Sequence, residues 1–124
     1  MPTRTLYHGA TGDAILSIIQ SGTMAPRQGR VYFSHHRPES TFMHGADRKR
    51  GACFAIRVDV DVPPGVIQRQ QFTHGVADAI IIETHAPLTV TVRELFIRPL
   101  GKPGQPEPMS RIPGVDEIRR YLGG

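Results

Sequence analysis

The sequence has no tryptophan, a single cysteine, and only three tyrosines and five phenylalanines among its 124 residues. One cysteine excludes an intramolecular disulfide and a zinc site built from cysteines. With so few aromatic rings, the core has to be built mainly from isoleucine, valine and leucine. Because Cys53 lies in the apolar segment 52–56 and has no basic neighbour there, we expect a buried hydrophobic side chain and not a reactive thiol.

Long apolar segments are missing as well. No stretch approaches the roughly 20 residues of a membrane-spanning helix, so we expect no contact with a membrane. Residues 1–5 lack the apolar centre of a secretory signal peptide. These features predict a cytoplasmic protein, or an effector that is secreted without a classical signal peptide.

Two kinds of ligand site are disfavoured by what the sequence lacks. It has no glycine-rich segment between a strand and a helix, which a Rossmann fold or a P-loop requires. His35, His36 and His44 lie close together in the sequence, but their spacing matches no standard zinc pattern. We therefore expect no bound metal.

The remaining composition is that of an ordinary globular domain. Hydrophobic residues make up 39% and charged residues 21% of the chain, and 124 residues fit one compact domain. Fifteen basic against eleven acidic side chains give a net charge of +4. This excess favours acidic partners such as nucleotides or RNA, and it also fits plain solubility.

The local patterns predict several short strands and few helices. A helix is predicted over residues 14–20, with N-cap chemistry at 11–13 and a stop at 21–22. A second short helix is predicted over 39–47, with Pro38 at its first position. Strands are predicted at residues 4–8, 30–34, 52–60, 66–71, 77–83 and 88–97. Because strands and helices do not alternate regularly, the predicted class is α+β.

The composition changes after residue 98. Residues 99–113 hold five of the eleven prolines, so we expect an extended arm on the surface. Residues 115–122 then predict a short amphipathic helix. We assign residues 1–98 to the main domain and residues 99–124 to an arm and helix packed on it.

Four segments together resemble the ADP-ribosyltransferase-like family. Residues 6–11 (LYHGAT) are similar to its YHGT/S opening, and residues 15–22 (ILSIIQSG) to the helix that follows. Residues 30–34 (RVYFS) resemble its VYLS strand, and residues 78–83 (DAIIIE) its late strand that begins with an acidic residue. The residue types are those of the His-Tyr-Asp branch, which includes rifamycin ADP-ribosyltransferases and bacterial toxin domains. The resemblance covers residues 4–98, most of the chain.

The resemblance implies a split β-sandwich of short strands and an enzyme that consumes NAD as a co-substrate. Its catalytic residues are expected to be His8, Tyr32 and Asp78, with Glu83 as the alternative acid. In this family the histidine hydrogen-bonds an NAD ribose, and the tyrosine ring stacks on the nicotinamide. The acid stabilises the ribose as nicotinamide leaves, or positions the acceptor. The residues expected to hold NAD are His8, Gly9, Thr11, Tyr32 and Ser34.

These residue types suit the reaction. Cleavage of the glycosidic bond puts positive charge on the ribose, which a nearby carboxylate stabilises. A flat aromatic face orients the departing ring, and a neutral imidazole both donates and accepts hydrogen bonds. Each residue alone also has a structural explanation, because a histidine at a strand end, a tyrosine within a strand and an aspartate before a strand are commonly packing or turn residues.

Other interpretations stay open. RNA 2′-phosphotransferases, which share this fold and also use NAD, open with HGT and carry a basic residue ahead of a strand like 52–59, but Tyr32 stands where they have a second histidine. A non-catalytic RNA-binding or protein-binding module on the same fold also fits the basic charge. The cluster 48–50 (RKR) is either a solvated turn or a grip on the NAD pyrophosphate or on a nucleic acid.

The sequence does not show whether the acceptor of ADP-ribose is a protein, a nucleic acid or a small molecule. A toxin role implies an antitoxin or immunity protein as partner, whereas a resistance role implies an antibiotic as substrate. Both roles rest on analogy with the family.

Overall fold

The computed structural model of the chain describes residues 3–35, 38–73, 76–100 and 109–123. The helices are α1 (Gly12–Ser21), the 3-10 helix η1 (Pro38–His44) and α2 (Val115–Gly123). The strands are β1 (Thr3–Gly9), β2 (Thr23–Met24), β3 (Arg30–Ser34), β4 (Ala46–Asp47), β5 (Ala52–Asp61), β6 (Ile67–Thr73), β7 (Val76–Glu83), β8 (Leu88–Pro99) and β9 (Ser110–Pro113).

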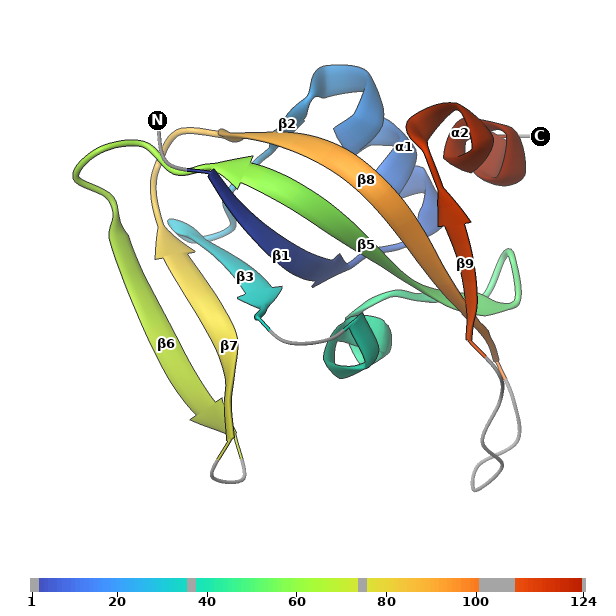
Figure 1. Cartoon of the computed structure of the whole chain (residues 1–124), viewed down its shortest axis with the longest axis horizontal. Helices are drawn as coiled ribbons and strands as arrows, with labels where there is room; N and C mark the ends of the chain where they lie inside the picture. Colours follow the sequence, from blue (N-terminus) through green and yellow to red (C-terminus); the bar gives the residue numbers. More distant parts are fainter. Residues whose placement is uncertain (1–2, 36–37, 74–75, 101–108, 124) are drawn as a thin grey trace.

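The strands form one sheet in the order β2-β8-β5-β1-β3-β7-β6, with β4 beside β5 and β9 beside β8. The neighbouring strands pair in antiparallel fashion. Figure 1 shows α1 and α2 side by side along β8, whereas η1 lies apart from them, near the ends of β1 and β3. A largely antiparallel sheet with few helices confirms the α+β class.

The helix α1 spans Gly12–Ser21, two residues longer at its start and one at its end than the predicted 14–20, and the predicted N-cap and stop are both present. The Thr11 hydroxyl accepts a hydrogen bond from the backbone N–H of Ala14, as an N-cap residue does, and Gly22 closes the helix with a left-handed φ of 68°. The buried side chain of Ile15 packs into the main core, and Ile18 and Ile19 pack against it. The spacing of these isoleucines therefore places one apolar stripe on the sheet.

The main core lies between the helices and one face of the sheet. Its members are aliphatic side chains and phenylalanines from both halves of the sheet, including Leu6, Phe33, Phe54, Ile56, Val58, Ile80, Ile82 and Leu95. Ile118 and Leu122 of α2 belong to the same cluster. The C-terminal helix thus completes the core, as its amphipathic pattern predicts.

The second face of the sheet carries a smaller cluster. Phe42 of η1 packs there against Ala55 and Phe96, and Cys53 lies at its margin. Cys53, expected to be a buried hydrophobic side chain, is only half-buried, and it packs against this cluster.

Two further expectations need correction, and one short strand is absent from the sequence prediction. Residues 39–47 do not form one helix, because the 3-10 helix ends at His44 and the chain then pairs with β5 as β4. The unpredicted strand is β2, which pairs with β8. The predicted arm over 99–113 is wrong at its end, where β9 pairs with β8, while residues 101–108 lie outside the described residues.

The sheet is nearly divided between β1 and β3. Seven residue pairs join β1 to β5, from Thr3↔Asp61 to Gly9↔Ala55, whereas the single pair Tyr7↔Ser34 joins β1 to β3. β1 and β3 thus form the junction between the two halves of the sheet (Figure 1), and His8 and Gly9 directly follow the paired residue Tyr7. The first predicted motif therefore lies at this junction.

Candidate functional site

His8 of β1 contacts β3 across the junction between the two halves of the sheet. Its Nδ1 lies 2.8 Å from the backbone carbonyl oxygen of Tyr32. A carbonyl oxygen only accepts, so Nδ1 carries the proton and Nε2 keeps a lone pair. The imidazole thus supplies a donor at the place where the backbone ladder between the two strands ends.

The surroundings of His8 favour its neutral form. Burial lowers the pKa of the imidazole, the hydrogen bond to the Tyr32 carbonyl raises it in part, and charge on nearby His44 lowers it further. The centroid of the imidazole ring also lies 5.7 Å from the centroid of the Phe33 ring. A neutral His8, fixed in one tautomer, offers an acceptor nitrogen to a ligand hydroxyl.

Tyr32 presents its side chain on the other face of β3. Val31 and Phe33 on either side of it are buried in the main core, whereas the Tyr32 ring is 49% exposed. The structure therefore brings His8 against the backbone of Tyr32 and not against its ring. A large exposed aromatic ring in the middle of a strand needs an explanation other than core packing, and stacking on a planar ligand is one.

Asp78 lies within β7 and not at its first residue. Ala79 pairs with both Ser34 and Gln71, and Ala77 pairs with Phe72, so Asp78 is the additional residue of a β-bulge. Bulges of this kind re-aim a side chain and are frequent beside active sites. The Asp78 side chain itself lies outside the part of the chain that the structure describes.

Glu83, the alternative acid, forms an ion pair with Arg69. Its Oε1 lies 2.6 Å from a guanidinium nitrogen of Arg69 on the neighbouring strand β6. It also stands directly across the ladder from Arg30 of β3. Glu83 is therefore a cross-strand partner at the end of β7, two residues beyond the pair Tyr32↔Ile81.

The remaining residues expected at the cofactor have local roles in the fold. Gly9 allows the backbone of η1 to approach, since a Cβ there would collide with the carbonyl oxygen of Thr41. Thr11 is the N-cap of α1 with an exposed side chain. Ser34 is 3% exposed, on the same face of β3 as Tyr32. Gly9 and Ser34 are buried, so Thr11 alone of these three has an exposed side chain.

The basic cluster before β5 separates into two kinds of residue. Arg50 is largely buried and donates hydrogen bonds to Asp47 at 3.0 Å, to Asp13 at 2.8 Å and to the carbonyl oxygen of Leu122 at 3.0 Å. Arg50 is therefore a structural residue that ties α1, the turn and α2 together. Arg48 remains exposed on the turn.

A buried carboxylate on the second face was missed by the sequence analysis. Glu94 of β8 is 5% exposed and pairs with Arg111 at 2.6 Å and with Arg57 at 3.5 Å. The Arg111 guanidinium also lies over the ring of Phe96. In the sequence, a charged residue inside the mostly apolar segment 90–97 is the signal that could have identified Glu94. In the fold, Glu94 joins β5, β8 and β9.

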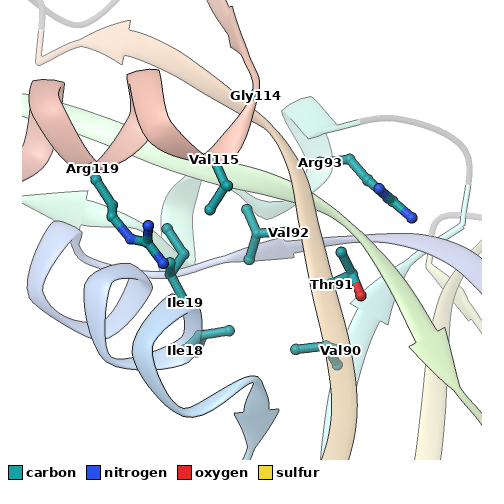
Figure 2. Close-up of a pocket in the computed structure, with 9 residues that line it drawn as sticks. All are labelled: Ile18, Ile19, Val90, Thr91, Val92, Arg93, Gly114, Val115 and Arg119. Carbon is teal, nitrogen blue, oxygen red and sulfur yellow. The ribbon is translucent and has the colours of Figure 1, made fainter.

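Hollows lie on the surface of the part of the chain that the structure describes. One is lined by Arg27, Gln28, Arg30 and Tyr32. Another lies between α1, β8 and α2, where Figure 2 shows aliphatic side chains between Arg93 and Arg119. No residue that the sequence predicts for NAD or catalysis lines this second hollow, so it is not part of the site.

Known proteins give no guide to the site, because no family model, no curated protein and no solved structure matches the chain. Within the described residues, no three histidine, cysteine, aspartate or glutamate side chains are grouped as a metal ion requires. In the same part of the chain, no helix has the length and apolar character needed to cross a membrane.

Proposed function

We propose that this protein is an NAD-dependent ADP-ribosyltransferase whose site opens between β1 and β3. One observation carries the proposal: the imidazole of His8 is hydrogen-bonded at 2.8 Å to the backbone of Tyr32, whose ring stands exposed. Two motifs separated by 24 positions in the sequence are thus joined by one hydrogen bond from a side chain to the backbone. Their residue types are those that the family resemblance predicts.

In the proposed reaction, each of these groups has one task. Nε2 of His8 accepts a hydrogen bond from a ribose hydroxyl of NAD, and the Tyr32 ring stacks on the nicotinamide. The glycosidic bond breaks and its electron pair leaves with nicotinamide, which becomes neutral. An oxygen or nitrogen atom of the acceptor then bonds to the ribose carbon and releases its proton to water.

Asp78 is the proposed acid. Its carboxylate would stabilise the positive charge that develops on the ribose, an electrostatic effect that removal of a preorganised group commonly shows to be worth about 3 kcal/mol. The bulge at this residue supports the choice over Glu83, since Glu83 is already neutralised by Arg69. An acid paired with arginine is a weaker stabiliser of a second cation.

The test is incubation of purified protein with NAD labelled in the adenylate phosphate, together with a fractionated cell extract. Label should appear in one acceptor fraction and should fall by at least about tenfold in Tyr32→Ala and Asp78→Ala. Tyr121→Ala is the matched control, because Tyr121 is 50% exposed and lies on α2, whereas Tyr32 is 49% exposed. Asp116→Ala, also on α2, is the control for loss of an exposed carboxylate.

A folded protein that neither binds NAD nor transfers label would refute the proposal and favour a non-catalytic binding module. Release of a 2′-phosphate from RNA would instead favour the phosphotransferase alternative. If expression arrests growth and His8→Ala restores it, the enzyme acts as a toxin, and a neutralising partner is then expected. Harmless expression with gained antibiotic resistance would identify a small-molecule acceptor.

A further inference from the structure

The turn before β3 holds two arginines side by side. The backbone N–H of Arg27 donates to the carbonyl oxygen of Arg30 at 2.9 Å, and the N–H of Arg30 donates to that of Arg27 at 3.0 Å. Residues that exchange both hydrogen bonds stand directly opposite each other and direct their side chains to the same side, with Cα atoms about 5.5 Å apart. The fold therefore holds two positive charges close together on one small surface.

No carboxylate of the described residues neutralises this pair through an ion pair. Eight other basic side chains of the described chain do form ion pairs with aspartate or glutamate: Lys49, Arg50, Arg57, Arg69, Arg93, Arg111, Arg119 and Arg120. Glu83, the residue opposite Arg30, is bonded to Arg69 instead. Because like charges placed directly opposite each other are destabilising, a bound anion would relieve the repulsion between Arg27 and Arg30.

The turn itself is held in an unfavourable conformation. Gln28 and Gly29 have φ values of 53° and 74°. Positive φ at both central residues is the arrangement of a type I′ turn, which asparagine or glycine adopts easily and glutamine does not. Glutamine therefore occupies a position that another residue would fill at lower cost, and its amide adds a donor and an acceptor beside the arginines.

Tyr32 forms the remaining wall of this hollow. The phenol of Tyr32 raises the pKa of the Arg30 guanidinium by hydrogen bonding, with a smaller effect from the charge of Glu83. Arg30 and Tyr32 also stand two residues apart on the same face of β3 and both line the hollow, while the backbone of Tyr32 is bonded to His8. The hollow and the proposed NAD site consequently share one residue.

We infer that the hollow formed by Arg27, Gln28, Arg30 and Tyr32 binds a phosphodiester group of a single-stranded nucleic acid, and that this nucleic acid is the acceptor. The inference rests on the proposed function insofar as it names the acceptor. Paired arginines bind phosphate oxygens, an exposed tyrosine supports a base, and a glutamine amide hydrogen-bonds a base edge. Each nucleotide carries a base beside its phosphate, and in RNA also a 2′-hydroxyl, so a phosphate at the arginines brings a nucleophilic base atom or hydroxyl close to Tyr32.

The test measures binding of a fluorescent single-stranded oligonucleotide to the whole protein in the absence of NAD. Arg27→Gln and Arg30→Gln should each weaken binding by about three- to tenfold, and each should reduce the slope of log affinity against log salt by about 0.7. Arg48→Gln is the matched control, since Arg48 is also exposed and has no ion pair among the described residues. Its removal should change affinity by less than about twofold.

Three results would overturn the inference: no binding of the oligonucleotide by the unaltered protein, an equal loss of binding in Arg48→Gln, or equally tight binding of a polyglutamate of the same charge. The last result would indicate an acidic protein as the ligand. Thermal unfolding of both variants with and without inorganic phosphate separates these results from misfolding, and only the unaltered protein should gain stability from phosphate. NAD consumption by the unaltered protein is measured separately, so an inactive enzyme and an empty hollow are distinguishable.

Discussion

The carboxylate of Asp47 accepts hydrogen bonds from both the backbone N–H and the guanidinium of Arg50, at 3.1 and 3.0 Å. The same carboxylate accepts a third bond from the backbone N–H of Gly12 at the start of α1, at 2.9 Å. Arg50 in turn reaches the end of α2. The Asp47–Arg50 pair therefore connects α1 and α2 through one turn.

Replacing Asp47 with asparagine should therefore lower the free energy of unfolding by about 3 kcal/mol, because Arg50 would lose its buried partner. Urea denaturation measures the loss. Asp116→Asn removes a carboxylate from an exposed pair on α2 and should cost at most about 1 kcal/mol. Equal losses in the two variants would show that the Asp47 carboxylate contributes no more than a surface pair.

Gly9→Ala should destabilise the protein severely, by roughly 3 kcal/mol or more, because the added methyl group would collide with the backbone of Thr41 and push η1 away from β1. Gly123→Ala is the control, since its Cβ would meet no neighbouring atom. Thermal unfolding should show a large fall in midpoint for the first variant and a small rise or no change for the second. A stable Gly9→Ala protein would mean that η1 does not hold the position described.

His8 should make folding stability depend on pH. Its pKa in the folded protein is lowered, mainly by burial, so the unfolded chain binds a proton more readily. The stability contributed by neutral His8 is thus fully present above the unfolded pKa of about 6.5 and is lost as the pH falls from there toward the folded pKa.

Denaturation at pH 7.5 and at pH 5.5 measures this loss. His8→Asn retains a donor for the Tyr32 carbonyl but cannot titrate, so its stability should change less between the two pH values. Since the other histidines are the same in both proteins, the difference isolates His8. Identical pH dependence in the two proteins would contradict a lowered pKa.

Gln28→Asn should raise the free energy of unfolding by about 0.5 to 1 kcal/mol, because asparagine adopts the positive φ of this turn with less strain. Chemical denaturation is again the measurement. Gln20→Asn on the exposed side of α1 should instead be neutral or slightly destabilising. A loss of stability in Gln28→Asn would show that the glutamine side chain itself supports the turn.

Elements with strong local signals were predictable from the sequence. The strand at 30–34 has the predicted bounds, and the early helix has its N-cap and its glycine stop in the sequence itself. The strand at 110–113 was not predictable, because the surrounding prolines and glycines suggest an arm. It also depends on pairing with β8, where Phe96, the partner of Arg111, is distant in the sequence. Long-range pairing overrides local composition there.

The candidate site was predictable as residue types but not as geometry. The motif around His8 and the strand around Tyr32 can be found in the sequence, yet nothing in it states that Nδ1 would meet a backbone carbonyl and not the tyrosine ring. The register of β1 against β3 decides this, and a shift of one residue would reverse the faces. The arginine pair at 27 and 30 was missed for the same reason, since it depends on a turn whose positive φ at Gln28 is unexpected.

The near division of the sheet between β1 and β3 also bears on how the molecule opens. One backbone pair, the His8 imidazole, a hydrogen bond from Arg4 to Gln68 and shared apolar packing join β3, β7 and β6 to the rest of the described residues. We expect two classes of amide hydrogen exchange, with slow exchange in β5 and β8 and faster exchange in β7 and β6. A bound nucleotide that contacts both β1 and β3 would then slow amide exchange in β7 and β6. Protection of β7 would therefore report occupancy of the site.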